Sequence, residues 1–193
     1  MDTELTTPDP LEPTDAHPLG ARVAIAVALL ATFMGIAKVK DDNVVQAMQQ
    51  VQSDRLDQWA FYQARNLREE VARATVATLR GLADATGRSD QLVGSIATYE
   101  ALAAEQAQKK EALRVQAEAD ARTYDALNYR DDQFDLSDAL ISIAIALLAV
   151  TAVTHQAWLF WFALAPAGAG VVMGVAGLAN LRLHSDILAR WLS

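Results

Sequence analysis

The sequence predicts an all-α membrane protein: three transmembrane helices, with a long antiparallel helical hairpin, coiled-coil-like in its pattern, between spans one and two. Charge distribution is the first observation behind this prediction. The chain of 193 residues is 52% hydrophobic, yet residues 23–37, 139–154 and 156–181 contain no Asp, Glu, Lys or Arg. The second observation is that the long segment between the first two runs is polar and free of proline. The alternative is a soluble bundle with three buried core helices. It is disfavoured, because this polar remainder offers no apolar faces to cover helices that are hydrophobic all round.

Composition also excludes several classes of function. The chain has no cysteine, which rules out a disulfide framework, a thiolate zinc site and a cysteine nucleophile. Its formal net charge of −8 argues against a nucleic-acid partner, which would require a basic face. The lipid bilayer is the partner that the uncharged runs predict.

Residues 1–20 are predicted to be a disordered acidic, proline-rich tail, since four of the five prolines fall there. Residues 21–38 form predicted transmembrane helix 1. Its uncharged part, 23–37, is about 22 Å long as a helix, which is short for a hydrocarbon core of about 30 Å. Arg22 and Lys38 can extend their charges outward from its two ends.

Residues 39–136 form the predicted hairpin, with its tip at 81–94, where Gly81, Gly87 and Gly94 lie among turn-forming residues. The tip separates two arms of nearly equal length, so the chain can leave the membrane and return to it. The second arm carries a row at three- and four-residue spacing, in which nine of thirteen positions are apolar or aromatic: Leu92, Ile96, Tyr99, Ala103, Gln106, Lys110, Leu113, Ala117, Asp120, Tyr124, Leu127, Asp131 and Phe134. The corresponding row of the first arm is Val44, Met48, Val51, Tyr62, Ala72, Val76 and Leu79. Both rows are thin, so we expect partners, most simply copies of the same chain.

Residues 137–154 and 157–181 are predicted transmembrane helices 2 and 3, joined by a tight turn at His155 and Gln156. Pro166 is expected to kink the third span. Residues 182–193 follow as an amphipathic C-terminal segment that continues the span or lies along the membrane surface.

Small residues in the spans predict close helix packing in the membrane. Ala24, Ala28 and Gly35 lie with Thr32 on one stripe of span one, and Gly170 and Gly174 form a GxxxG step in span three. Packing within one chain and packing between subunits are equally compatible with this pattern. The spans contain no ionisable residue at depth, which argues against a pump or a coupled transporter.

An aromatic cluster in the first arm is the candidate interaction site, namely Trp59, Phe61, Tyr62 and Gln63. Residues two apart on a helix face different sides, so we expect part of the cluster to contact a second surface.

The stretch Asp57–Arg65 reads D-Q-W-A-F-Y-Q-A-R, and through it the chain resembles DUF4337, a family of uncharacterised bacterial membrane proteins. The resemblance covers the chain from about residue 20 onward and implies one N-terminal span, a helix with this motif, a charged helix and two closely spaced C-terminal spans. Arg65 stands where lysine is usual, and the resemblance implies no activity.

The resemblance and the charges together predict a multi-pass protein of the bacterial inner (plasma) membrane. Arginine and lysine gather at the membrane ends of the hairpin and at the C-terminus, whereas Arg22 alone lies on the other side. The positive-inside rule therefore places the hairpin and the C-terminus in the cytoplasm.

We expect no enzyme. The three histidines have no metal-ligand spacing, and the acidic pairs Asp41-Asp42, Glu69-Glu70 and Asp131-Asp132 are expected to be solvated faces. No catalytic residue, cofactor or metal site is predicted. The leading hypothesis is an oligomerising scaffold, or an accessory subunit of a membrane assembly, acting through the hairpin on itself or on other membrane proteins. The alternative is a homo-oligomeric pore or channel whose hairpins form a vestibule.

Overall fold

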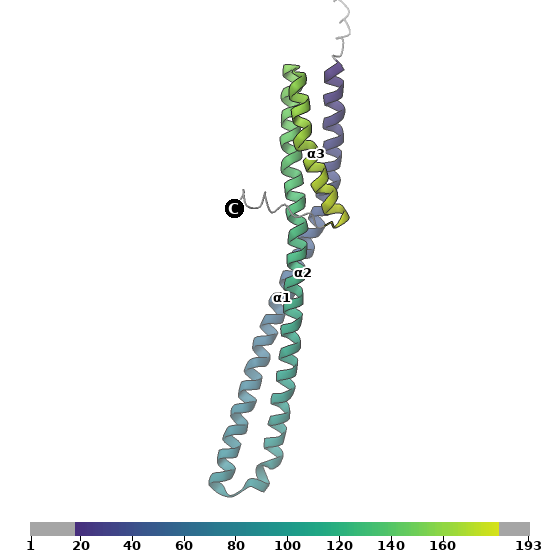
Figure 1. The fold of residues 1–193 in the computed structure, drawn as a ribbon. Coiled ribbons are helices and arrows are strands. Elements are labelled where there is room, and N and C mark those ends of the chain that lie inside the picture. Colours follow the sequence, from purple (N-terminus) through teal and green to yellow (C-terminus); the bar gives the residue numbers. More distant parts are fainter. Residues whose placement is uncertain (1–17, 182–193) are drawn as a thin grey trace, which may run out of the picture. The chain divides into compact units, whose positions relative to one another are not determined.

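The structure is a computed structural model that describes residues 18–181. It contains three helices, α1 (Pro18–Thr86), α2 (Ser89–Thr154) and α3 (Ala157–Ala179), and no strand within the described residues (Figure 1). The all-α prediction is confirmed. Each helix includes a stretch long and apolar enough, by length and composition, to cross a membrane.

The helix ends follow from local chemistry. Pro18 begins α1, where its fixed φ suits a helix and its missing N–H costs nothing. Gly87 ends α1 with a positive φ of 67°, and its N–H donates to the Ala83 carbonyl at 2.9 Å. The α3 helix ends at Asn180, also left-handed at φ 56°, and the Leu181 N–H donates back to the Ala176 carbonyl at 2.9 Å.

Two predicted boundaries need correction. The tip expected at 81–94 is mostly helical, because only Gly87 and Arg88 lie between α1 and α2. A single left-handed glycine is enough to end one helix, so the flanking glycines remain helical. The tail expected at 1–20 is helical from Pro18 onward; its residues 1–17 and the C-terminal segment 182–193 lie outside the described residues.

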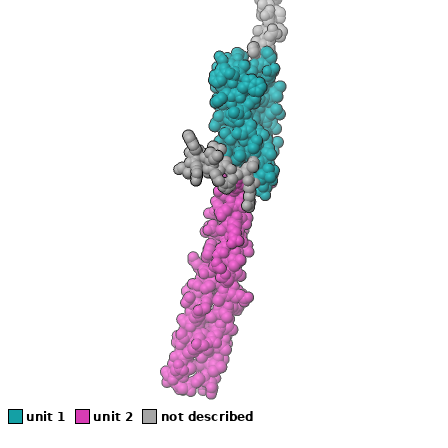
Figure 2. Space-filling model, viewed as in Figure 1, with its two compact units in different colours: residues 1–38, 133–193 teal, residues 39–132 magenta. Residues whose placement is uncertain are grey.

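The chain divides into two compact units, shown in Figure 2. Unit 1 comprises residues 1–38 and 133–193, and unit 2 comprises residues 39–132. Because the division falls inside α1 and α2, each unit contains a part of both helices.

Unit 1 is built around α2. Its buried core joins Val23 and Leu30 of α1, Ile141, Ala144 and Leu148 of α2, and Ala163 and Ala167 of α3. The three α2 residues are fully buried and follow one another at helical spacing, so one face of α2 carries the contacts of this core.

Unit 2 is an antiparallel pair formed by α1 and α2. In α2, every position of the predicted row except Tyr99 is buried or half-buried, and so is every position of the α1 row. Within unit 2, these positions lie on the sides of the two helices that face each other, except Tyr99. Their small size is also evident, since the fully enclosed apolar residues of unit 2 are mostly alanines such as Ala72 and Ala117.

Candidate functional site

Polar contacts cross the interior of unit 2 along its length. From one end to the other they join Gln58 to Asp120 (2.8 Å), Arg65 to Gln106 (2.9 Å), Asn66 to Lys110 (2.9 Å), Glu69 to Lys110 (2.6 Å) and Arg80 to Glu100. From the first contact to the last, the α1 number rises from 58 to 80 while the α2 number falls from 120 to 100, as an antiparallel pair requires. Together these contacts hold the two helices in register.

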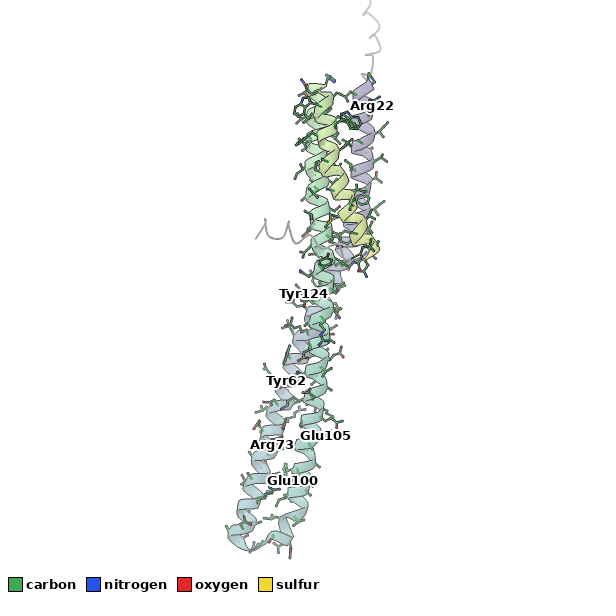
Figure 3. The ribbon with its side chains drawn as sticks, in the orientation of Figure 1. Arg22, Tyr62, Arg73, Glu100, Glu105 and Tyr124 are labelled. Atoms are coloured by element: carbon green, nitrogen blue, oxygen red, sulfur yellow. The ribbon has the colours of Figure 1, made fainter. Side chains whose placement is uncertain are left out.

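Glu69 and Lys110 lie at the centre of these contacts. Glu69 is only 4% exposed, and its carboxylate also accepts from Arg73 at 2.6 Å. The hydrogen bond from Lys110 holds the pKa of Glu69 below its usual value, and the same bond raises the pKa of Lys110. The Lys110 ammonium also lies 5.9 Å from the centre of the Tyr62 ring, within the range of a cation–π contact. Tyr62 and Arg73 lie on the same helix, α1 (Figure 3).

The aromatic cluster divides between two surfaces. Trp59 and Tyr62 are half-buried and meet edge to face, with ring centres 5.3 Å apart. Phe61 and Gln63 are exposed, and Phe61 keeps 61% of its surface. Tyr62 therefore takes part in the helix pair through Lys110 of α2, and Trp59 packs on its ring. Phe61 instead presents a large apolar side chain to the surroundings.

The acidic pairs are not uniformly solvated, and this expectation was wrong for two of them. Glu69 and Asp41 are buried, at 4% and 3% exposure, whereas their neighbours Glu70 and Asp42 are exposed. Adjacent residues on a helix point about 100° apart, so one member of each pair faces inward. The burial of Glu69 had one indication in the sequence: Lys110 is a cation in the predicted inward row of α2, and it needs an acidic partner on α1.

A pocket of about 510 Å³ opens between the helices of unit 2. Its lining consists of Val45, Met48, Gln49, Gln52, Ser53, Leu56, Tyr124 and Asp131. No residue of α1 from 52 to 57 is buried or half-buried, so the seam is open here. The predicted α1 row has no member between Val51 and Tyr62, and Gln52, Ser53 and Leu56 in this part of α1 line the pocket.

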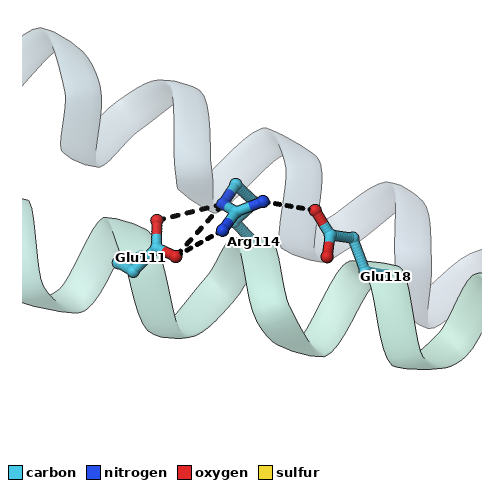
Figure 4. A network of polar contacts seen from close by, with 3 residues as sticks. All are labelled: Glu111, Arg114 and Glu118. Carbon is cyan, nitrogen blue, oxygen red and sulfur yellow. Dashed lines mark hydrogen bonds and ion pairs between the residues drawn. The ribbon is translucent and has the colours of Figure 1, made fainter.

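Charged residues on α2, of which Arg114 and Glu118 are half-buried, pair within the helix. Arg114 donates to Glu111 at 2.5–3.2 Å and to Glu118 at 2.5 Å (Figure 4). These contacts raise the pKa of Arg114 and lower that of Glu111. Because both partners of Arg114 lie on the same helix, these contacts stabilise α2 itself.

Three glycines of α3, namely Gly170, Gly174 and Gly177, pack inside unit 1. A Cβ added at Gly170 would lie 2.8 Å from Ile141, and one at Gly174 would lie 2.7 Å from both Phe33 and Ser137. The GxxxG step therefore allows close approach of helices within one chain. Ala24, Ala28, Thr32 and Gly35 of α1 are instead exposed, and no atom lies within 4 Å of a Cβ added at Gly35.

Sequence reasoning missed Gln133. Its side chain is buried at 2% exposure and donates to the Leu181 carbonyl at 3.0 Å, so α2 caps the end of α3. Across residues 18–181 no group of three histidine or acidic side chains could hold a metal ion.

The geometry so far defines a class: an all-helical protein whose three long apolar helices are compatible with a membrane protein and whose unit 2 is a polar helix pair. A family described as a domain of unknown function, DUF4337, matches residues 19–180. The chain belongs to this family, as the D-Q-W-A-F-Y-Q-A-R motif predicted. No curated protein and no solved structure matches it.

Proposed function

We propose that this chain is a non-enzymatic integral membrane protein that acts as an oligomerising scaffold or as an accessory subunit of a membrane assembly. The three apolar helices anchor it, and the helical hairpin of unit 2 lies outside the bilayer as the docking element. The charged content of unit 2 supports this placement, since charges in the hydrocarbon core are costly.

Exposed apolar side chains on a polar unit are the observation that carries the proposal. Leu56, Phe61, Leu67 and Val71 keep 57–65% of their surfaces exposed on one helix of unit 2. Large apolar side chains exposed in this way outside a membrane favour a protein-binding surface. The hairpin therefore has an interaction surface besides its inner seam.

The ionisable groups of unit 2 favour pairing over catalysis. Glu69 and Lys110 neutralise each other and are held further by Arg73 and Asn66. Charge pairs satisfied in this way fix the relative position of two helices. We therefore assign these groups to helix register.

We place the protein in the bacterial inner membrane with the hairpin and C-terminus in the cytoplasm. Lys38, Lys40, Arg122 and Arg130 lie near the ends of the apolar stretches on the hairpin side, against Arg22 on the other. The positive-inside rule favours this orientation.

A homo-oligomeric pore is the second candidate, and one observation favours it. The stripe of Ala24, Ala28, Thr32 and Gly35 is exposed in the single chain and could line a path or contact another copy. Conductance across liposomes reconstituted with the purified chain tests this candidate. Liposomes that stay sealed at a defined oligomer number would eliminate it.

The scaffold function is tested by extraction in mild detergent, followed by measurement of protein mass and capture of partners from the same membranes. Trp59→Ala removes the ring that packs on Tyr62 and is expected to reduce oligomer size or partner capture. Trp161→Ala changes an exposed tryptophan of unit 1 and serves as the matched control. An unchanged mass and an unchanged partner set for Trp59→Ala would show that the aromatic cluster has no interaction role.

A further inference from the structure

Each helix of unit 2 carries a second row of side chains, which is exposed and uncharged. Row A, on α1, consists of Leu56, Ala60, Leu67, Val71, Thr78 and Leu82. Row B, on α2, consists of Val93, Ala97, Ala104, Gln108, Val115 and Ala119. All twelve residues are exposed, and the large ones keep between 49% (Leu82) and 65% (Leu67) of their surfaces.

Both rows follow the same spacing, which repeats every eleven residues. Leu67 follows Leu56 by this interval, as Leu82 follows Val71, and on α2 Ala104 follows Val93 and Val115 follows Ala104. An eleven-residue repeat stays on one side of a nearly straight α-helix. Each row is thus a continuous stripe suited to another helix.

The rows point away from the interior of unit 2. Buried Glu69 lies two positions from both Leu67 and Val71, and buried Ala117 lies two positions from both Val115 and Ala119. Two positions on an α-helix correspond to about 200°. The intrachain helix pair therefore leaves both rows uncovered.

The two rows also lie at matching residue distances from the turn at Gly87 and Arg88. The contacts of Gln58 with Asp120 and of Arg80 with Glu100 show that α1 and α2 run antiparallel from this turn. Counted in residues from the middle of the turn, each member of row A is as far away as one of row B: Leu56 and Ala119, Ala60 and Val115, Leu67 and Gln108, Val71 and Ala104, Thr78 and Ala97, Leu82 and Val93. In four of these six pairs, a branched side chain corresponds to an alanine.

We infer that row A of one copy packs against row B of the next copy, in a head-to-tail contact between hairpins. This inference rests on the proposed scaffold function and names the partner as a second copy of this chain. Copies inserted in the same direction into one membrane bring α1 beside the α2 of a neighbour in the antiparallel sense, at equal height. Because the contact joins two different surfaces, it is heterologous and closes into a ring when the rotation allows.

Size and charge favour this pairing over one between two α1 helices. Large side chains facing small ones interdigitate, as they do in packed helical cores. Two facing copies of row A would set leucine against leucine and leave row B exposed. Neither row contains a charge, so their contact removes no ion from water. The Thr78 hydroxyl already donates to the Ala74 carbonyl at 2.9 Å and so needs no further partner.

The area of one contact explains why anchoring matters. Row A is about 39 Å long, and with a contact width of about 10 Å it buries roughly 800 Å² in total. This is below the approximately 1,000 Å² expected of a stable pair in solution. Each copy makes two such contacts, and confinement to one membrane raises the effective concentration of its neighbours.

Cysteine crosslinking of the full-length chain in membranes tests the inference, because the sequence has no native cysteine. The double variant Val71→Cys/Ala104→Cys is expected to give a ladder of disulfide-linked multimers, since each copy offers one cysteine to each neighbour. Single variants are expected to stay monomeric on non-reducing gels. The control Val71→Cys/Ala97→Cys shifts one partner by about 10 Å along the helix and is expected to give no ladder. A dimer from Val71→Cys alone, or no ladder from the first pair, would overturn the inference.

Charge substitutions give an independent measurement. Val71→Asp in row A and Val115→Asp in row B are each expected to lower the mass of the detergent-extracted protein toward the 20.9 kDa of one chain. Leu102→Asp, on α2 outside row B, is expected to leave the mass unchanged. If Val115→Asp has no effect while Val71→Asp does, two α1 helices pair instead and the inference is wrong.

Failure of this inference is distinguishable from failure of the scaffold function. An unsubstituted chain that has the mass of a single copy in detergent and shows no crosslinking in membranes contradicts both proposals. A different result contradicts only the packing of row A on row B: the Val71→Asp and Val115→Asp variants both remain oligomeric, and the Val71→Cys/Ala104→Cys variant gives no ladder.

Discussion

Replacing Gly170 by alanine should destabilise unit 1, because the added methyl group has no space. Its carbon would lie 2.8 Å from Ile141 Cγ1, 3.1 Å from Leu140 Cβ and 3.1 Å from the Ser137 carbonyl oxygen. Ile141 is fully buried and the carbonyl belongs to the backbone, so neither atom can move aside without moving a helix. Overpacking of this kind costs about 1–3 kcal/mol.

Gly168 provides a matched control two residues away in the same helix. A Cβ at Gly168 meets no atom within 4 Å, so Gly168→Ala adds a methyl group without a clash. Glycine to alanine in a helix is favourable by about 0.5–1 kcal/mol, and this gain is common to both variants. The difference between their free energies of unfolding therefore isolates the steric cost, about 1–3 kcal/mol.

The assay is unfolding in mixed micelles by increasing fractions of a denaturing detergent, followed by far-ultraviolet circular dichroism. Gly170→Ala should unfold at a lower denaturant fraction than the unsubstituted chain, and Gly168→Ala at the same or a higher fraction. If Gly170→Ala is as stable as Gly168→Ala, α3 does not approach α2 as closely as described, and the packing of unit 1 is wrong.

Two further predictions concern unit 2. In the folded protein the pKa of Glu69 lies below its ordinary value of 4.5. The Glu69 carboxylate therefore stabilises the fold fully above about pH 4.5, and this stabilisation is lost as the pH falls through the lowered pKa. Between about pH 3 and pH 6, the unfolding temperature of the control Glu70→Gln should fall as the pH is lowered, and that of Glu69→Gln should fall less. An equal dependence of the unfolding temperature on pH in the two variants would contradict the buried ion pair. Cysteines replacing Val45 and Asp131, which line the same pocket, should be joined within one chain by a short bifunctional maleimide. Failure to bridge them, while each reacts singly, would show that α1 and α2 are not paired there.

The sequence was most informative where periodicity decides the structure. The three- and four-residue spacing of Ala103, Gln106, Lys110 and Ala117 identified the inward face of α2, because side chains so spaced share one side of a helix. Uncharged runs identified the three apolar stretches for a similar reason, since length and composition alone determine whether a helix can span a bilayer.

Contacts between residues distant in sequence were harder to predict. Glu69 and Lys110 are 41 positions apart, and only the register of α1 against α2 brings them together. Periodicity specifies which side of each helix faces inward but not how far one helix slides along the other. The same limit applies to Gln133, whose role as a cap for α3 depends on where α3 ends.

The candidate interaction residues were predicted as a single cluster, which the structure divides. Trp59 and Tyr62 are three positions apart and share a side of α1, whereas Phe61 and Gln63 lie on other sides. Rows A and B were missed because alanine, threonine and glutamine give little hydropathy contrast. Their pattern became visible only when burial had separated inward from outward positions.

The central claim is that the chain crosses a membrane three times and that the hairpin lies on its cytoplasmic side. Single cysteines at Arg88, beside the α1–α2 turn, and at Gln156, between α2 and α3, test it with a membrane-impermeant maleimide. Both positions are exposed and neither has a positive φ, so cysteine is tolerated there. Arg88→Cys should be labelled only in inside-out vesicles, Gln156→Cys only in right-side-out vesicles, and the buried Ala144→Cys in neither. Labelling of Arg88→Cys and Gln156→Cys from the same side, or release of the chain from membranes without detergent, would contradict the account.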